Sequence, residues 1–240
     1  MNLLIGIDDT DNLESRGTGY RVRQLANWLA ENRLGVPRGI TRHQLLVDPR
    51  IPYTSHNSSA CMFIETDHVE DVWEASSEFL LRESASGSDA GLCLAEWNSI
   101  NAEVIAFARR AKLEVLAISE AGQTASRSAL RLAGLTGTGG GIIGALAGVG
   151  LRREGNDGRF LWLPGLRELK GRYRIDEIHA KANVDRVCTL NDENLSPETL
   201  IDVGEWARPV LRGGQATLFV EEQNHEWSIL PKDRVKNLSN

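Results

Sequence analysis

Residues Leu3-Leu4-Ile5-Gly6-Ile7-Asp8-Asp9-Thr10-Asp11 join an apolar run to three carboxylates. The apolar run predicts a buried strand. The carboxylates at its end repel one another and lose hydration where they are partly buried. Such groups coexist when a divalent cation lies between them, and hard oxygen ligands suit Mg²⁺. We therefore predict Asp8, Asp9 and Asp11 as metal ligands and catalytic residues of a site for phosphate chemistry. The alternative is an acidic turn in which the aspartates act only as turn and capping residues.

The composition is that of an ordinary globular protein, because 41% of the 240 residues are hydrophobic and 25% are charged. The longest apolar stretch, 142–151, is too short and too rich in glycine to span a membrane, so no membrane partner is expected. Cys61, Cys93 and Cys188 lie far apart and form no CxxC pair. Their spacing argues against a zinc ribbon and a disulfide framework, and it favours a cytoplasmic location.

The formal net charge of -6 has the wrong sign for a general nucleic-acid binder. The charge is uneven, however, because the segment 152–174 contains seven basic and three acidic residues. A solvated surface face is the ordinary meaning of such a run. A patch for phosphate or RNA is the alternative.

The order of predicted elements alternates between strands and helices, which indicates an α/β or α+β fold with one or two mixed sheets. Residues 84–91 form a Ser/Gly-rich connector that indicates a hinge or flexible loop. After the opening strand, helices are predicted over 20–32, 69–82, 101–112, 126–133 and 197–207, and strands over 44–47, 60–65, 92–96, 114–118, 160–163, 216–221 and 226–230.

The segment Arg16-Gly17-Thr18-Gly19 predicts a glycine turn that leads into the first helix. A phosphate placed there would meet backbone N–H groups at the helix start. The Thr18 hydroxyl could coordinate Mg²⁺ or bind phosphate, and Arg16 could neutralise charge during phosphoryl transfer. Arg16, Gly17 and Thr18 are therefore predicted to bind a cofactor, and Thr18 is also a catalytic candidate. The alternative for Arg16 is a free surface side chain.

A glycine segment, Gly137-Thr138-Gly139-Gly140-Gly141-Ile142-Ile143-Gly144, contains a GxGxxG spacing that is weak evidence by itself. No clear strand is predicted before it, so a Rossmann site is not expected. It lacks the Lys-Ser/Thr ending of a Walker A loop. Gly137, Gly139, Gly140 and Gly141 are predicted to cradle a phosphate or other ligand. The alternative is tight helix packing through Gly144 and Gly148.

A polar loop follows Asp48-Pro49, and its residues Tyr53, Thr54, Ser55, His56 and Asn57 are predicted to line the substrate pocket. His56 could act as an acid, a base or a phosphate contact, because its ordinary pKa lies near working pH. Taken alone, a solvated loop histidine is the simpler interpretation.

These motifs, GIDDTD, the Arg-Gly-Thr turn, DPxIPY and TGTGGGIIGA, occur in one order. In that order they resemble the archaeal agmatinylcytidine synthetase family, which modifies an isoleucine tRNA. The resemblance implies an enzyme that uses ATP and Mg²⁺ to activate a cytidine and then attaches agmatine. It also implies a mixed-sheet, kinase-like ATP/Mg-binding domain, expected over residues 1–98, and a ferredoxin-like α+β domain with the glycine-rich loop, expected over 99–240.

Position by position, the resemblance makes Asp8, Asp9 and Asp11 metal ligands. It also places Thr18 close to the transferred phosphate. Gly140 falls where the family usually has an Asn. The family's Lys-Thr-Arg-Gly-Asn after IPY is replaced here by Thr54-Ser55-His56-Asn57-Ser58, so two cations are lost. The OB-fold and zinc-ribbon domains that follow in the family are not expected in this chain.

The leading hypothesis is a cytoplasmic, Mg²⁺-dependent enzyme that phosphorylates an acceptor, with amine attack as a following step. Its partners would be a nucleotide and a small-molecule or RNA acceptor. The competing hypothesis is a non-catalytic nucleotide- or RNA-binding subunit of a split tRNA-modifying complex, in which a partner protein supplies RNA binding.

Overall fold

The computed structural model describes residues 1–54 and 56–238, and it divides into two compact units, Met1–Glu154 and Gly155–Asn240. The elements of the first unit are, in chain order, β1 (Asn2–Asp8), α1 (Thr18–Glu31), β2 (Val36–Gln44), β3 (Ser58–Glu65), α2 (Val69–Glu83), β4 (Gly91–Glu96), a short turn η1 (Trp97–Ser99), α3 (Ala102–Arg110), α4 (Ile118–Arg127), β5 (Arg131–Gly134) and α5 (Ile142–Glu154).

The strands of the first unit form an antiparallel sheet in the order β5-β4-β1-β3-β2. The first six elements, β1-α1-β2-β3-α2-β4, are two interlocked βαβ units with strand order 4-1-3-2, which is the ferredoxin-like arrangement. This arrangement therefore lies within residues 2–96 and not within the expected 99–240.

The division of the chain lies at Glu154/Gly155 and not between residues 98 and 99. The reason is that β5 pairs with β4 and α5 packs along β1, so the segment after residue 98 completes the first sheet. The prediction that part of this unit is kinase-like stays a prediction.

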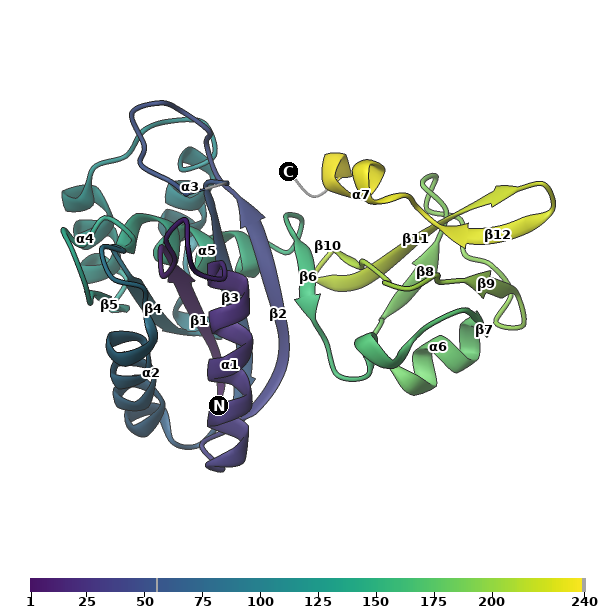
Figure 1. The fold of residues 1–240 in the computed structure, drawn as a ribbon, viewed down its shortest axis with the longest axis horizontal. Coiled ribbons are helices and arrows are strands. Elements are labelled where there is room, and N and C mark those ends of the chain that lie inside the picture. Colours follow the sequence, from purple (N-terminus) through teal and green to yellow (C-terminus); the bar gives the residue numbers. More distant parts are fainter. Residues whose placement is uncertain (55, 239–240) are drawn as a thin grey trace. The chain divides into compact units, whose positions relative to one another are not determined.

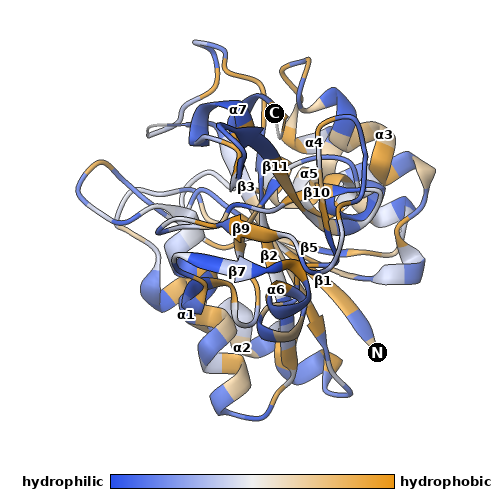
Figure 2. Ribbon diagram, turned by 90° about the vertical axis from the view of Figure 1, so that its right-hand side faces the viewer, coloured by the Kyte–Doolittle hydropathy of each residue, from blue (hydrophilic) through white to orange (hydrophobic). Residues whose placement is uncertain are grey.

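Strand β1 is central because its side chains are apolar on both faces. Leu3, Leu4, Ile5 and Ile7 are fully buried, and burial of each such side chain contributes about 2 kcal/mol. Leu4 belongs to the core formed with α3, α4 and α5, so by strand alternation Leu3, Ile5 and Ile7 face the side covered by α1 and α2. Figure 1 shows the helices on either side of the strands, and Figure 2 shows the hydrophobic colouring along β1.

Gly6 explains how α5 can lie so close to β1. A Cβ atom at this position would overlap the backbone carbonyl of Ala145. The helix therefore packs against the strand at backbone contact distance. This close packing brings the start of α5 to the end of β1, where the aspartates lie.

The second unit combines a mixed sheet with short helices. Its elements are β6 (Arg159–Trp162), a short turn η2 (Leu166–Glu168), β7 (Arg172–Arg174), α6 (Ile175–Lys181), β8 (Arg186–Cys188), β9 (Leu200–Asp202), β10 (Val210–Arg212), β11 (Gln215–Gln223), β12 (Glu226–Ile229) and α7 (Lys232–Leu238). The strand order is β6-β10-β11-β12-β9-β7, and β8 pairs with β11 in parallel while β9 pairs with β12 in parallel. Phe160, Ile178, Val203 and Leu218 contribute to the core of this unit.

The mixed α/β fold class is confirmed, with local corrections. The predicted strand at 114–118 and helix at 126–133 are wrong, because α4 occupies 118–127 and β5 follows it. Buried Ala121, Thr124 and Ala125 give α4 its helical spacing. The helix predicted over 197–207 is also wrong, because β9 there pairs with β7 and β12. Within the part of the chain that the structure covers, no helix is long and apolar enough to cross a membrane.

Candidate functional site

The acidic turn begins where β1 ends, at Asp8. Asp8 and Asp9 are half-buried, and Asp9 has a φ of 51°. This left-handed conformation is unfavourable for most residues but is tolerated by aspartate. The sharp turn places three carboxylates at one end of the sheet, as the sequence predicted.

Asp11 is held by hydroxyl and amide donors. Its Oδ1 accepts the Thr18 hydroxyl at 2.9 Å and the Thr18 N–H at 3.2 Å, and its Oδ2 accepts the Thr54 hydroxyl at 2.8 Å. Thr18 is the first residue of α1, so Asp11 satisfies one of the free N–H groups at the helix start. Thr18 itself is buried and also accepts hydrogen bonds from Thr10. The network connects the acidic turn, the glycine turn and the polar loop.

The glycine segment is brought to the same place. It follows β5, which corrects the expectation that no strand precedes it. A Cβ atom on Gly144, in the first turn of α5, would overlap the Asp8 carboxylate, and one on Gly141 would overlap the carbonyl of Asp89. Gly148 packs against Ser59. Gly144 and Gly148 therefore allow α5 to pack closely, which was the alternative interpretation of these glycines. The loop 137–141 instead surrounds the carboxylate of a residue outside the glycine segment.

That carboxylate belongs to Asp89, which sequence reasoning missed. Asp89 lies in the connector that was interpreted as a hinge. It accepts hydrogen bonds from the Thr138 N–H and hydroxyl, both at 2.5 Å. Its position just before β4 could have identified it as a site residue. Strand β4 runs antiparallel to β1 and pairs Gly91 with Asp8. A carboxylate before β4 must therefore lie near the end of β1.

The carboxylates of this cluster are electrostatically strained. Burial raises the pKa of Asp8 to about 7, and the negative charges of Asp9 and Asp11 add to this shift. A hydrogen bond from the Asp9 N–H and the charge of Arg42 oppose it. Burial also raises the pKa of Asp9 to about 6, with further contributions from the charges of Asp89 and Asp11. A cation placed here would relieve this strain.

The residues present fit Mg²⁺ only if a ligand shares the coordination. In residues 1–54 and 56–238, no group of three or more His, Cys, Asp or Glu side chains is arranged to hold a metal ion. Asp11 in particular is engaged with Thr18 and Thr54. Mg²⁺, however, is commonly bound by one or two carboxylates together with substrate phosphates. Asp8 and Asp9 suit that mode.

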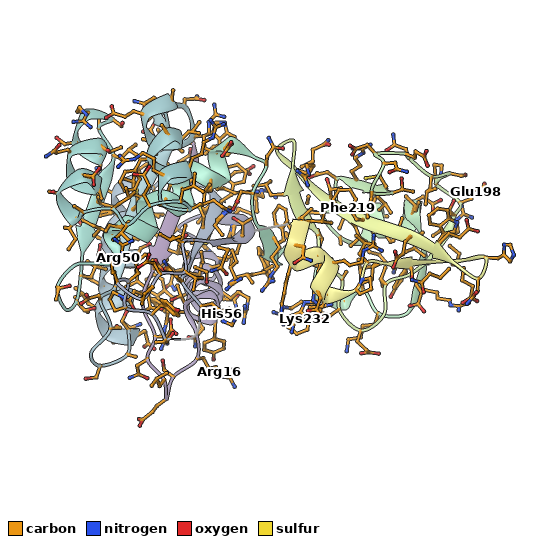
Figure 3. The ribbon with its side chains drawn as sticks, turned by 90° about the horizontal axis from the view of Figure 1, so that it is seen from above. Arg16, Arg50, His56, Glu198, Phe219 and Lys232 are labelled. Atoms are coloured by element: carbon orange, nitrogen blue, oxygen red, sulfur yellow. The ribbon has the colours of Figure 1, made fainter. Side chains whose placement is uncertain are left out.

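The remaining predicted residues are less closely connected to the cluster. Arg16 is exposed and lies over the Tyr20 ring, 4.5 Å from its centroid. Figure 3 shows Arg16 and His56 at the surface of the first unit. Tyr53 is exposed as well.

The rest of the polar loop and of the glycine turn contribute in different ways. Asn57 closes the base of the loop, because its side chain donates to the carbonyl of Leu46 at 2.6 Å. Thr54 contacts an aspartate of the turn directly, through its hydroxyl and Asp11. Gly17 lies beside Asp11. Ser55 lies outside the described residues.

Comparison with solved structures shows a similarity to one enzyme over part of the chain. The chain is similar to solved structures of a tRNA-modifying enzyme, in the free form and in complexes with tRNA and nucleotide. That enzyme is TiaS, the agmatidine synthetase that acts on an isoleucine tRNA. The similarity has a TM-score of 0.54 with 25% identity for apo TiaS, and 0.55 with 26% for TiaS in complex with that tRNA and ATP. For the complex of TiaS with the tRNA, AMPCPP and agmatine the TM-score is 0.54, with 25% identity.

The matches cover 62% of this chain and 35–36% of the TiaS chains, so this chain spans about a third of their length. No protein-family model and no curated protein matches the sequence.

Proposed function

We propose that this chain is a Mg²⁺-dependent enzyme that transfers a phosphoryl group from ATP to an acceptor, with displacement by an amine as the following step. The observation that carries the proposal is that three segments with suitable chemistry meet at one place in the fold. The acidic turn and the start of α1 are close in sequence, and the glycine loop, which lies far along the chain, meets them at the end of β1. The similarity to TiaS structures that contain ATP or AMPCPP supports a nucleotide as the ligand.

Each part of the site has a role in this proposal. Asp8 and Asp9 would hold Mg²⁺, which offsets negative charge on the phosphates. Gly17 and Thr18 present the N-terminus of α1, and Gly137–Gly141 presents a glycine backbone, and both favour anions. Asp11 orients Thr18 by its hydrogen bonds. Thr54 and the rest of the polar loop would border the acceptor.

The proposal is tested by ATP turnover of the purified chain, with and without Mg²⁺, tRNA and small amines such as agmatine. We expect turnover that requires Mg²⁺ and rises when an acceptor is present, because the metal offsets charge on the transferred group. Product analysis for ADP, AMP and phosphate identifies which bond breaks. An absence of both ATP binding and turnover with every acceptor would refute the enzyme.

RNA binding by the second unit is a second candidate function, because an exposed aromatic–arginine cluster favours it. Trp206 is 50% exposed, and Arg167 and Arg208 lie 5.0 Å and 5.6 Å from its ring centroid. For the residues that the structure covers, neither guanidinium has a carboxylate partner. By contrast, Arg172 pairs with Glu226 and Arg174 with Asp176, so part of the basic 152–174 segment is neutralised.

Trp206→Ala is the variant that tests this candidate. Bases stack on exposed aromatic rings, and loss of one platform weakens single-strand binding by about 10-fold. Binding of a fluorescent single-stranded RNA is measured by anisotropy at two salt concentrations. Arg172→Ala is the matched control, because that arginine is already paired. Equal affinities of Trp206→Ala and wild type would rule out this surface.

A further inference from the structure

We propose that Asp89 is a positioning residue that holds the glycine loop against the acidic turn. The expected effect of Asp89 on ATP binding rests on the proposed function, whereas its expected effect on the structure of the loop does not. Asp89 contacts both halves of the site. Its carboxylate accepts from Thr138 at 2.5 Å through both oxygens, and its carbonyl accepts the Gly141 N–H at 3.0 Å. Its own N–H donates to the Asp9 carboxylate.

The loop is shaped around this side chain. Gly137 has a φ of 58°, and a Cβ atom there would overlap the Asp89 carboxylate. A Cβ atom on Gly140 would lie 3.2 Å from Asp89 Oδ2. The glycines therefore allow the backbone to wrap the carboxylate at hydrogen-bond distance. Without that acceptor, the Thr138 N–H and hydroxyl would lose their partner, and of the contacts between Asp89 and the loop the backbone bond from the Gly141 N–H to the Asp89 carbonyl would remain.

Neighbouring contacts reinforce the connection from the other side of the loop. The Thr136 hydroxyl donates to the Ser88 carbonyl at 2.6 Å and accepts the Ala90 N–H at 2.8 Å. The residues on both sides of Asp89 are thus also bonded to the segment before the glycine loop. The end of the segment interpreted as a hinge is therefore bonded to the segment 136–141 at three successive residues, and Asp89 is the central one.

The geometry requires the hydrogen bonds of Asp89 and not its charge. An Asn at this position can accept the Thr138 N–H through Oδ1 and donate to the Thr138 hydroxyl through Nδ2. Asp89→Asn therefore preserves the side-chain bonds to Thr138, whereas Asp89→Ala removes them. A residue that acted as a metal ligand, or one that competed with phosphate for the loop, would respond differently to this pair of variants.

The experiment compares wild type, Asp89→Asn, Asp89→Ala and Thr138→Val. Amide hydrogen exchange is measured without nucleotide, and ATP binding and turnover are measured with Mg²⁺. We expect Asp89→Ala to speed exchange over 137–141 and to lower kcat/KM for ATP about 10- to 100-fold, mainly through KM, because the loop is no longer held in place. Asp89→Asn should stay within about 3-fold of wild type in both measurements. Thr138→Val keeps the N–H bond and should give an intermediate exchange rate, and it replaces Asp89→Ala if that variant does not fold.

Three results would overturn the inference. Equal exchange in Asp89→Ala and wild type would show that the loop does not depend on Asp89. A loss of turnover in Asp89→Asn as large as in Asp89→Ala would show that the charge matters. Tighter ATP binding by Asp89→Ala would show that the carboxylate competes with phosphate. If wild type binds no ATP, the proposed function fails, while the exchange measurement still decides the role of Asp89.

Discussion

Asp8→Asn is expected to reduce ATP turnover at least about 100-fold, the size of effect found when a group that stabilises developing charge is removed. Asn keeps the size and one oxygen of the side chain, but it removes the charge that would hold Mg²⁺. The same variant should unfold less readily than wild type above pH 7. At pH 8 we expect its free energy of unfolding to be higher by on the order of 1 to 3 kcal/mol, because a partly buried, repelled anion is gone.

The sign of this stability change follows from the direction of the pKa shift. The pKa of Asp8 is about 7 in the folded protein and 3.8 for the unperturbed group. The folded state therefore binds the proton more tightly, and the metal-free protein loses stability as pH rises from about 4 to about 7. Asp9, whose pKa is raised to about 6, contributes in the same direction. Asp8→Asn should flatten this part of the pH profile, as measured by chemical denaturation in EDTA.

Asp67→Asn is the control for Asp8→Asn, because Asp67 is an exposed carboxylate paired with the N-terminal amine. It should change neither turnover nor the pH profile by more than a small amount. Full turnover in Asp8→Asn would contradict a role for Asp8 in binding Mg²⁺. A lower stability of that variant at pH 8 would contradict the electrostatic strain.

Gly144→Ala should damage both the stability of the first unit and its turnover. The added Cβ would overlap the Asp8 carboxylate, so either that side chain or the start of α5 must move. Overpacking of this kind costs about 1 to 3 kcal/mol of stability. Displacement of a site carboxylate by about 1 Å lowers turnover on the order of 100-fold. Turnover and thermal unfolding of the variant measure the two effects.

Gly122→Ala is the matched control, because Gly122 also lies in a helix, α4, and a Cβ there meets nothing within 4 Å. Alanine is the better helix former, so this variant should gain up to about 1 kcal/mol and keep its turnover. If Gly144→Ala behaves like Gly122→Ala, the start of α5 is not packed against Asp8 as described.

The central part of the fold could be predicted because β1 carries an unambiguous signal. Its apolar residues are buried on both faces, and the run ends in the turn where the aspartates lie. The N-cap of α3 could also be predicted. The Asn101 side chain accepts hydrogen bonds from the Glu103 and Val104 N–H groups at the predicted helix start. These signals are local, so the sequence contains them.

The errors occurred where long-range pairing decided the conformation. Ser196-Pro197-Glu198 has the composition of a helix start, but residues 200–202 pair in a sheet with β7 and β12. The domain boundary was misplaced for the same reason, because β5 joins the first sheet through a strand that lies far earlier in the chain. Pairing partners of this kind are not visible in local propensity.

In the candidate site, too, local features could be predicted from the sequence and long-range contacts could not. The acidic turn and the glycine segment were identified separately from their composition, but nothing local showed that Gly144 contacts Asp8. Asp89 was missed because a single carboxylate in a Ser/Gly-rich stretch is typical of a surface loop. Only the antiparallel pairing of β4 with β1 brings it near Asp9.

The most direct test of the central claim is isothermal titration of ATP into wild type and Asp8→Asn, with and without Mg²⁺. We predict that wild type binds ATP with a micromolar to submillimolar Kd that depends on Mg²⁺, and that Asp8→Asn binds at least about 10-fold more weakly. Equal binding by the two proteins, or ATP binding by wild type that does not change when Mg²⁺ is removed, would contradict the claim that the end of β1 is a metal–nucleotide site.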